Sequence, residues 1–240
     1  MGMKSFLIAA AVGVALASVE GATIAAAERE APADVVAIDV LLHPDQTMLA
    51  AAAKANQALR ADYPAGFALD ALHTPHISMI QRFVRRDDLK QVEAAVAAVF
   101  AKIDPTTLKL EGVGYYSLPV GDLGLAGIVV KPTAELRALQ DQIVAALEPF
   151  AVEGTAATFV PPGAGETIAP SIVEYVNRYV PERTGEHFNP HVTVGLGTKE
   201  FVRELIAAPF PAFAFKPTGA SIYHLGNFGT AAKELWRLPQ

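Results

Sequence analysis

Two short stretches of the chain carry the same arrangement of side chains that could transfer protons and hold an anion. The first, HTPHISMIQ, spans residues 73–81, and the second, HFNPHVTVG, spans residues 187–195. In each, a Pro-His pair precedes a branched aliphatic residue, a hydroxyl residue and another apolar residue. An imidazole can accept or donate a proton near neutral pH, and a hydroxyl can donate a hydrogen bond to an anionic oxygen. The candidate site residues are His76, Ser78, His191 and Thr193.

The spacing within each stretch fits a β-strand. Successive side chains of a strand point to opposite faces, so His76 and Ser78 share one face, as do His191 and Thr193. If two such strands meet across a cleft, they form a near-symmetric box of two imidazoles and two hydroxyls. That box suits a phosphoryl group, because the hydroxyls can bind its non-bridging oxygens while one neutral imidazole accepts a proton and one imidazolium donates one.

Other residues near the repeated stretches leave alternatives open. Arg82 shares the face of His76 and Ser78 if the strand stays regular, which makes it a candidate for binding an anionic substrate. An arginine at a strand end is, however, more often a surface residue. A metal site would use His73 or His187, but this spacing on an extended segment is not typical of metal ligands and no acidic cluster accompanies it. We therefore predict no metal and no cofactor.

The elements that must position these residues alternate between strand-like and helix-like periodicity. The predicted strands are at residues 35–42, 76–84, 108–118, 124–131, 191–197, 220–225 and 234–238. The predicted helices begin after Asp45, at Asp87 or Asp88, after Thr133 and near Thr198. The order of strand, helix, His-bearing strand and helix, partly echoed in the second half, suggests a duplicated α+β unit.

Residues 151–187 interrupt this alternation with a long, turn-rich stretch in which only SIVEYVNRYV, residues 171–180, could form a short helix. Tyr175, Arg178 and Tyr179 lie on it. They could stack on a base and bind phosphate, or they could belong to an amphipathic helix that packs its aromatic side chains inward.

The paired sequences Pro75-His76-Ile77-Ser78-Met79 and Pro190-His191-Val192-Thr193-Val194 resemble the paired signature of the two-histidine (2H) phosphoesterases. This family includes the bacterial 2′-5′ RNA ligase-like proteins and cyclic nucleotide phosphodiesterases. The order of elements from about Val35 onward and the ending SIYHLGNFGTAAKELWRL also resemble that family. The resemblance implies an α+β fold of two pseudo-symmetric lobes, in which antiparallel sheets flank a central cleft and helices lie outside. It further implies that His76 and His191 are the catalytic base and acid, and that Ser78 and Thr193 hold the phosphate.

The resemblance implies a metal-independent phosphodiesterase that hydrolyses 2′,3′-cyclic, related cyclic or 2′-5′ phosphodiesters of nucleotides or RNA ends. One alternative is an exported protein that binds a phosphorylated ligand without turnover, and another is a phosphoesterase acting on a non-nucleotide cyclic phosphate. The chain differs from the small bacterial members in two ways: it has a predicted export signal at its start, and a long stretch at 151–187 separates the motifs. We therefore do not predict RNA ligase activity for it.

The start of the chain predicts export. Lys4 precedes an apolar run from Phe6 to Val19, and small-residue triplets follow it, as in a secretory signal, with an uncleaved membrane anchor as the alternative. We predict a signal peptide over residues 1–27, one two-lobed domain over 28–240 with a long irregular insertion at about 151–187, a periplasmic location and no stable membrane insertion after cleavage.

Composition narrows the chemistry further. The chain has no cysteine, which excludes disulfides, thiolate nucleophiles and cysteine-based metal sites. Its formal net charge is −6, whereas proteins that bind long nucleic acids through phosphates are usually basic. The expected partner is therefore a small nucleotide or an RNA end rather than a long nucleic acid, and nothing in the sequence predicts an oligomeric state.

Overall fold

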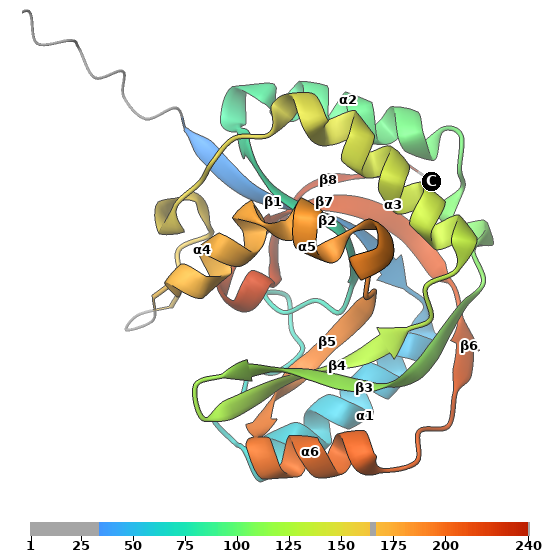
Figure 1. The fold of residues 1–240 in the computed structure, drawn as a ribbon, viewed down its shortest axis with the longest axis vertical. Helices are drawn as coiled ribbons and strands as arrows, with labels where there is room; N and C mark the ends of the chain where they lie inside the picture. The colour runs from blue at the N-terminus through green and yellow to red at the C-terminus, as the bar shows by residue number, and fades with distance from the viewer. Residues whose placement is uncertain (1–33, 164–166, 240) are drawn as a thin grey trace, which may run out of the picture. The chain divides into compact units, whose positions relative to one another are not determined.

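The computed structural model describes residues 34–163 and 167–239, and the predicted signal peptide over residues 1–27 lies outside these ranges. Two four-stranded sheets dominate the described part (Figure 1). All pairings within them are antiparallel. The α+β class and the two-lobed arrangement expected from the sequence are confirmed.

Both strands that carry the repeated motif lie at the edge of their sheet. The first sheet has the order β2 (Ile77–Arg85), β1 (Val35–Pro44), β7 (Pro217–Leu225) and β8 (Ala231–Arg237). The second sheet has the order β5 (His191–Thr198), β4 (Leu123–Val130), β3 (Leu110–Val120) and β6 (Phe213–Phe215). The short strand β6 is the one strand of these sheets that the sequence periodicity did not predict.

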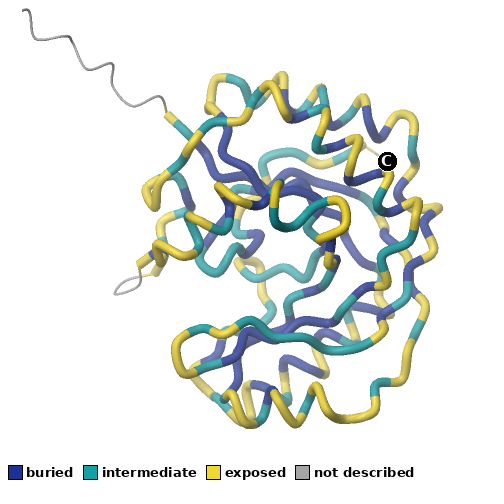
Figure 2. Tube along the Cα trace, viewed as in Figure 1, coloured by how far each residue is buried: buried dark blue, intermediate teal, exposed yellow. Residues whose placement is uncertain are grey.

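Helices cover the outer face of each sheet (Figure 1). Next to the first sheet lie α2 (Leu89–Phe100) and α3 (Ala134–Leu147). Against the second sheet lie α1 (Gln46–Asp62) and α6 (Lys199–Ala207). The buried residues of the chain concentrate in the strands and on the inner faces of these helices (Figure 2). Within the described ranges, no helix is both long and apolar enough to cross a membrane.

The lobes are not consecutive halves of the chain, which refines the prediction of a duplicated unit. Helix α1 follows the first strand of the first sheet but packs against β5 of the second. The C-terminal hairpin of β7 and β8 returns to the first sheet and pairs with β1. Each lobe thus combines segments from the first and the second half of the chain.

The helices begin where capping side chains predict. Asp45 accepts hydrogen bonds from the backbone N–H groups of Thr47 and Met48, and Thr133 and Thr198 cap α3 and α6 in the same way. The start of α2 differs, because Asp88 makes no cap hydrogen bond and a 3₁₀ turn over Arg86–Asp88 leads into the helix instead.

Both motif strands contain a β-bulge directly after the motif's hydroxyl residue. In β2 the extra residue is Met79, where the pairing with β1 shifts register. In β5 the extra residue is Val194, where the pairing with β4 shifts register. A bulge leaves one residue out of the ladder and bends the strand, so its backbone carbonyl needs another hydrogen-bond partner when it is buried.

Buried carboxamide side chains satisfy both bulges. Gln140 of α3 donates from Nε2 to the Met79 carbonyl at 3.0 Å. Asn56 of α1 donates from Nδ2 to the Val194 carbonyl at 2.9 Å, and also to the Phe67 carbonyl at 3.0 Å. Asn56 is 6% exposed and Gln140 is fully buried. One helix from each lobe therefore fixes the backbone of one motif strand.

We predict that Asn56→Ala and Gln140→Ala each lower the free energy of unfolding by about 1–3 kcal/mol, because a buried carbonyl loses its donor. Urea unfolding followed by circular dichroism measures the change. Gln57→Ala and Gln142→Ala are matched controls, since these amides lie exposed on the same two helices. Equal losses in the buried and exposed pairs would show that the bulge carbonyls do not depend on these side chains.

Candidate active site

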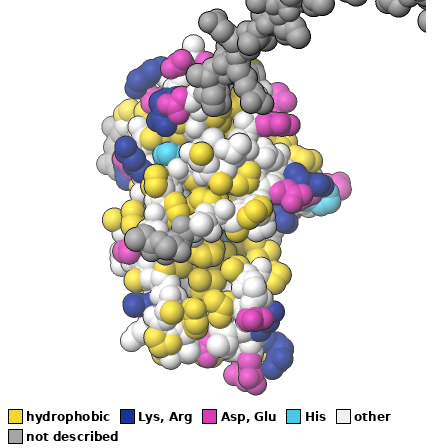
Figure 3. Space-filling view, turned by 90° about the vertical axis from the view of Figure 1, so that its left-hand side faces the viewer, with side chains coloured by type: hydrophobic (Ala, Val, Ile, Leu, Met, Phe, Trp, Pro, Cys, Tyr) yellow, Lys and Arg dark blue, Asp and Glu magenta, His cyan; other side chains and the backbone are white. Residues whose placement is uncertain are grey.

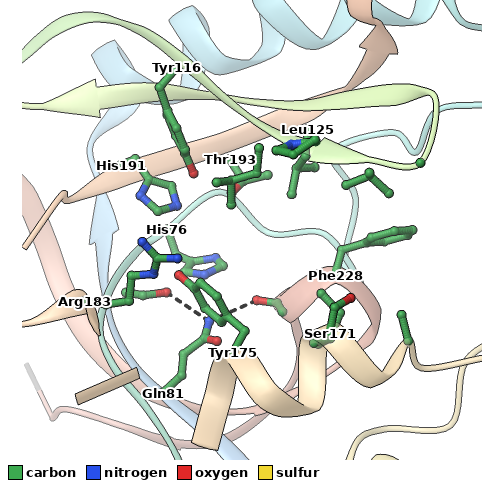
Figure 4. Close-up of a pocket in the computed structure, with 18 residues that line it drawn as sticks. His76, Gln81, Tyr116, Leu125, Ser171, Tyr175, Arg183, His191, Thr193 and Phe228 are labelled. Atoms are coloured by element: carbon green, nitrogen blue, oxygen red, sulfur yellow. Dashed lines mark hydrogen bonds between the residues drawn. The ribbon is translucent and has the colours of Figure 1, made fainter. Parts of the chain in front are cut away.

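A cavity of about 400 Å³ lies where the motif strands of the two sheets approach each other (Figure 4). The structure brings all four motif side chains to its wall: His76 and Ser78 from β2 and the residue before it, and His191 and Thr193 from β5. Tyr116 of β3, Gln81 of β2 and Arg183 at the end of α5 (Tyr179–Arg183) join them. The strand parity argued from the sequence thus places the two imidazoles and the two hydroxyls around one space.

The residue two positions before each histidine fixes the orientation and tautomer of its ring. His76 Nδ1 lies 2.7 Å from the Thr74 carbonyl, and His191 Nδ1 lies 2.8 Å from the Asn189 carbonyl. A carbonyl can only accept, so Nδ1 carries the hydrogen in both rings and Nε2 is the nitrogen left for chemistry. The intervening proline restricts the residue before it to extended backbone and has no N–H of its own to compete for that carbonyl.

Asp39 distinguishes the two histidines. It is fully buried in β1, and its Oδ2 lies 3.4 Å from His76 Nε2. The same oxygen accepts hydrogen bonds from Ser78 Oγ and from Gln81 Nε2, the latter at 3.0 Å. Its other oxygen, Oδ1, has no hydrogen-bond partner among the described residues. A buried carboxylate in this position stabilises a neighbouring positive charge.

The two rings therefore hold protons differently. Burial alone lowers the pKa of His76, but the hydrogen bond and the charge of Asp39, together with the Thr74 carbonyl, outweigh it and raise the pKa above its ordinary value. Burial lowers the pKa of His191 to about 4, and the positive charges of His76 and Arg183 add to this while the Asn189 carbonyl opposes it. Asp39 thus favours the imidazolium form of His76, whereas His191 is a neutral imidazole at neutral pH.

Arg82 does not reach the cavity, which corrects its prediction as a substrate-binding residue. The bulge at Met79 reverses the parity of β2, so Gln81 instead takes the cavity face that Arg82 would occupy on a regular strand. Arg82 is buried on the opposite side, where it donates to the Leu147 carbonyl at 2.8 Å and forms an ion pair with Glu148 at 3.0 Å.

The two hydroxyl residues have different partners. Ser78 donates its proton to Asp39, so in this arrangement it supports the carboxylate rather than facing a ligand as a free donor. Thr193 lies beside the Tyr116 hydroxyl, and burial raises the pKa of Tyr116 far above its ordinary value, with the charge of Tyr175 adding to the effect. Tyr116 therefore keeps its proton and can donate it to an anion.

Tyr116 reaches His191 because of a glycine on the next strand. The two rings meet edge to face, with centroids 4.5 Å apart. Gly127 of β4 lies beneath the tyrosine, and a Cβ there would stand 2.4 Å from Tyr116 Cε1. The absence of a side chain at this position gives the tyrosine ring its place against the histidine.

The irregular stretch supplies one wall of the cavity. Tyr175 of α4 (Pro170–Asn177) lines it, and the Arg183 guanidinium lies 5.1 Å from the centre of the Tyr175 ring. In the described part of the chain, Arg183 forms no ion pair, and its buried Nε has no hydrogen-bond partner. Arg178 instead pairs with Glu182 and Glu174 on the surface, and Tyr179 is buried. Arg183 is the one arginine or lysine among the described residues that lines the cavity, and its guanidinium can meet an anionic ligand.

The remaining histidines near the motifs do not form a cluster. His73 pairs with Asp70 at 2.8 Å and stacks on Phe67, while His187 is exposed. The described ranges include no group of three or more His, Cys, Asp or Glu side chains that could hold a metal ion.

Four site residues were missed by the sequence reasoning: Asp39, Gln81, Tyr116 and Arg183. Asp39 did leave a signal, because it is a single acidic residue in the otherwise apolar run VVAIDVLL, and a buried charge needs a partner. Gln81 could not be found without knowing of the bulge. Tyr116 and Arg183 reach the cavity only through the packing of distant elements.

A family described as the 2′-5′ RNA ligase superfamily matches residues 48–225. The sequence matches no curated protein significantly. Similar solved structures include TT0787 of Thermus thermophilus, which is 14% identical with a TM-score of 0.49 and coverage of 84% of this chain and 96% of that chain.

Two further structures show the same kind of similarity. Escherichia coli LigT complexed with ATP is 14% identical with a TM-score of 0.41, and the match covers 86% of this chain and 99% of that chain. Usb1 of Kluyveromyces marxianus is 10% identical with a TM-score of 0.39, and the match covers 86% of this chain and 98% of that chain.

We predict that Gly127→Ala displaces Tyr116 from His191 and lowers the free energy of unfolding by about 1–3 kcal/mol, because the added methyl overlaps the ring. Gly114→Ala in β3 is the matched control, since a Cβ at residue 114 meets nothing within 4 Å. Chemical denaturation measures both variants. The account of Tyr116 fails if the two substitutions change stability equally.

Proposed function

The chain belongs to the 2′-5′ RNA ligase superfamily of two-histidine phosphoesterases, and on this premise we propose that it is a metal-independent phosphodiesterase that opens cyclic phosphates. The proposed substrates are 2′,3′-cyclic or related phosphodiesters of nucleotides or RNA ends. One observation carries the proposal: two imidazoles line the same cavity, Nδ1 of each is bonded to a carbonyl, and a buried carboxylate lies beside His76, 3.4 Å from its Nε2. General acid/base catalysis requires such a pair.

The pKa directions assign the roles in the proposed reaction. Neutral His191 accepts a proton at Nε2 from a water molecule as the water oxygen forms a bond to phosphorus. The ester bond between phosphorus and one ring oxygen breaks, and that oxygen takes the proton from Nε2 of the His76 imidazolium. The product is a phosphomonoester with a free hydroxyl. His191 then holds the proton and His76 is neutral, so exchange with solvent restores the starting state.

The same residues account for binding of the phosphate in this proposal. Arg183 and the His76 imidazolium supply positive charge, and the hydroxyls of Thr193 and Tyr116 supply hydrogen-bond donors to non-bridging oxygens. In this proposal, Arg183 and the His76 imidazolium stabilise the negative charge of the phosphate, and no metal ion has that role. Asp39 acts as a positioning residue, because it contacts the histidine and the serine and does not line the cavity.

Export through a signal peptide over residues 1–27, with a periplasmic location, stays a proposal, since those residues lie outside the described ranges. It is supported by the basic start, the short apolar run and the small residues that follow. N-terminal sequencing of the protein recovered from a periplasmic fraction tests it, and an intact Met1 there would contradict cleavage.

We predict that His76→Ala and His191→Ala each lower kcat for 2′,3′-cyclic nucleotides by roughly 10²–10⁴-fold in buffer containing a chelator, because each removes one proton transfer. The double variant should lose little more than either single one, since the two residues act in one step. Release of phosphomonoester is the readout. His187→Ala is the matched control, because His187 is exposed and does not line the cavity.

Two results would contradict this mechanism. Activity that chelation abolishes would show that a metal ion takes part. Thermal stabilisation by the same nucleotides without any product would instead support an exported protein that binds a phosphorylated ligand without turnover.

We predict that kcat/KM is bell-shaped in pH. The rising limb lies near pH 4, where His191 loses its proton, and the falling limb lies above pH 6.5, where His76 loses its proton. Asp39→Asn removes the charge that raises the pKa of His76, so the falling limb should move to lower pH. Asp70→Asn, which alters an Asp-His pair outside the cavity, should leave that limb in place. A falling limb unmoved by Asp39→Asn would reject the assigned roles.

A further inference from the structure

The cavity has two ends of different chemistry (Figure 4). The catalytic end holds both histidines, Tyr116, Gln81 and Arg183, and Thr193 lies between the ends. The outer end is formed by the tip of the β3–β4 hairpin, the start of α4 and the turn before β8. Leu118 borders both ends, since it also lines a smaller cavity with Tyr116, Arg183 and His191. The other lining side chains of the outer end are Pro119, Val120, Leu125, Ala169, Ser171, Ile172 and Phe228. All of these except Ser171 are apolar.

Several of these side chains lie outside the apolar clusters of the protein. Leu118, Val120, Leu125 and Phe228 belong to none of the apolar clusters found among the described residues. Leu125 is nevertheless only 7% exposed. The surface that Leu118, Val120 and Phe228 leave uncovered by protein includes their part of the cavity wall, where a ligand can cover it.

Phe228 is held in an uncommon conformation at this end. Its φ is +57°, and it is the one residue other than glycine with positive φ in the described part of the chain. Bulky side chains rarely adopt the left-handed region, and such residues cluster at sites that bind ligands. Figure 4 shows its ring pointing away from the two histidines, and the ring stacks on Phe67 with centroids 6.3 Å apart.

The outer end lacks the groups that would recognise a nucleoside. Among the described residues that line it, Ser171 is the only side chain with a hydrogen-bonding group, and none is charged. A nucleobase edge and ribose hydroxyls would lose water there and find only the Ser171 hydroxyl as a side-chain partner, which weakens binding. An apolar group loses nothing comparable and gains from leaving water.

The surface around the cavity mouth is also largely apolar. Figure 3 shows the face that carries the hairpin tip and α4, and hydrophobic side chains gather along its middle while charged side chains lie at its margins. Soluble proteins rarely expose a continuous apolar patch without a binding role.

From these observations we propose that the natural substrate is a phosphodiester that carries an apolar arm, an alkyl chain without hydrogen-bonding groups, which occupies the outer end of the cavity. The inference rests on the proposed phosphodiesterase function and narrows its substrate class. The phosphate lies between Arg183 and the two histidines, and the arm lies against Leu118, Leu125 and Phe228.

The test uses one five-membered cyclic phosphate with arms of different length. The substrates are glycerol 2,3-cyclic phosphates bearing a methyl, butyl or octyl ether at the remaining hydroxyl, compared with 2′,3′-cyclic AMP and 2′,3′-cyclic UMP. We expect kcat/KM to rise roughly threefold for each methylene until the arm fills the outer end, and the octyl compound to exceed both nucleotides. Nucleotides that outperform every alkyl compound, with no dependence on chain length, would overturn the inference while leaving the phosphodiesterase function intact.

A pair of variants on β3 locates the effect. Leu118→Asn should reduce the ratio of kcat/KM for the octyl and methyl compounds at least tenfold. Val113→Asn should keep that ratio, because Val113 is an exposed apolar residue of the same strand that does not line the cavity. An equal ratio in the two variants would overturn the assignment of the arm to the outer end.

Calorimetric titration with acyclic methyl alkyl phosphodiesters separates this inference from the catalytic one. One outcome is that no cyclic phosphate is hydrolysed while affinity still rises with chain length and falls in Leu118→Asn. That result would support the binding of an apolar arm and reject the phosphodiesterase function. If neither turnover nor affinity depends on the chain, the apolar arm is rejected.

Discussion

The hydrogen bonds from two buried carboxamides to two bulge carbonyls are the constraint on which the site depends. Asn56 and Gln140 hold the strands just beyond the hydroxyl residues, at Val194 and Met79. Each bulge changes the parity of its strand and so decides which later side chains face the cavity. Since the two helices that supply the amides pack on different sheets, the same interactions tie each motif strand to its own helical layer.

The two histidines have near-identical backbone contacts but different side-chain neighbours. Both histidines donate Nδ1–H to the carbonyl two residues earlier, so both rings make the same hydrogen bond to the backbone. The difference comes from their neighbours: a buried carboxylate beside His76, and a tyrosine ring and two positive charges near His191. A pair with separated pKa values can provide an acid and a base in the same pH range. The two similar motif strands form the cavity, and Asp39 makes their histidines differ in pKa.

Local rules predicted a large part of this structure. Strand alternation placed the four motif side chains on one cavity, and capping residues such as Asp45 and Thr133 marked the helix starts. Arg82 was misplaced because one extra residue at Met79 cannot be seen in an alternating pattern. Tyr116, Arg183 and Phe228 reach the cavity through contacts between elements far apart in the chain, which periodicity does not encode. The domain boundaries and the signal peptide stay predictions.

The protonation of the two imidazoles in the free protein is the central claim, because the proposed roles follow from it. Nitrogen-15 NMR titration of the histidine side chains measures it directly, with assignments from His76→Ala and His191→Ala. At pH 7 the account predicts His76 protonated on both nitrogens, and His191 neutral with its hydrogen on Nδ1 and a pKa near 4. Two histidines titrating together near 6.5, or a protonated His191 beside a neutral His76, would contradict it.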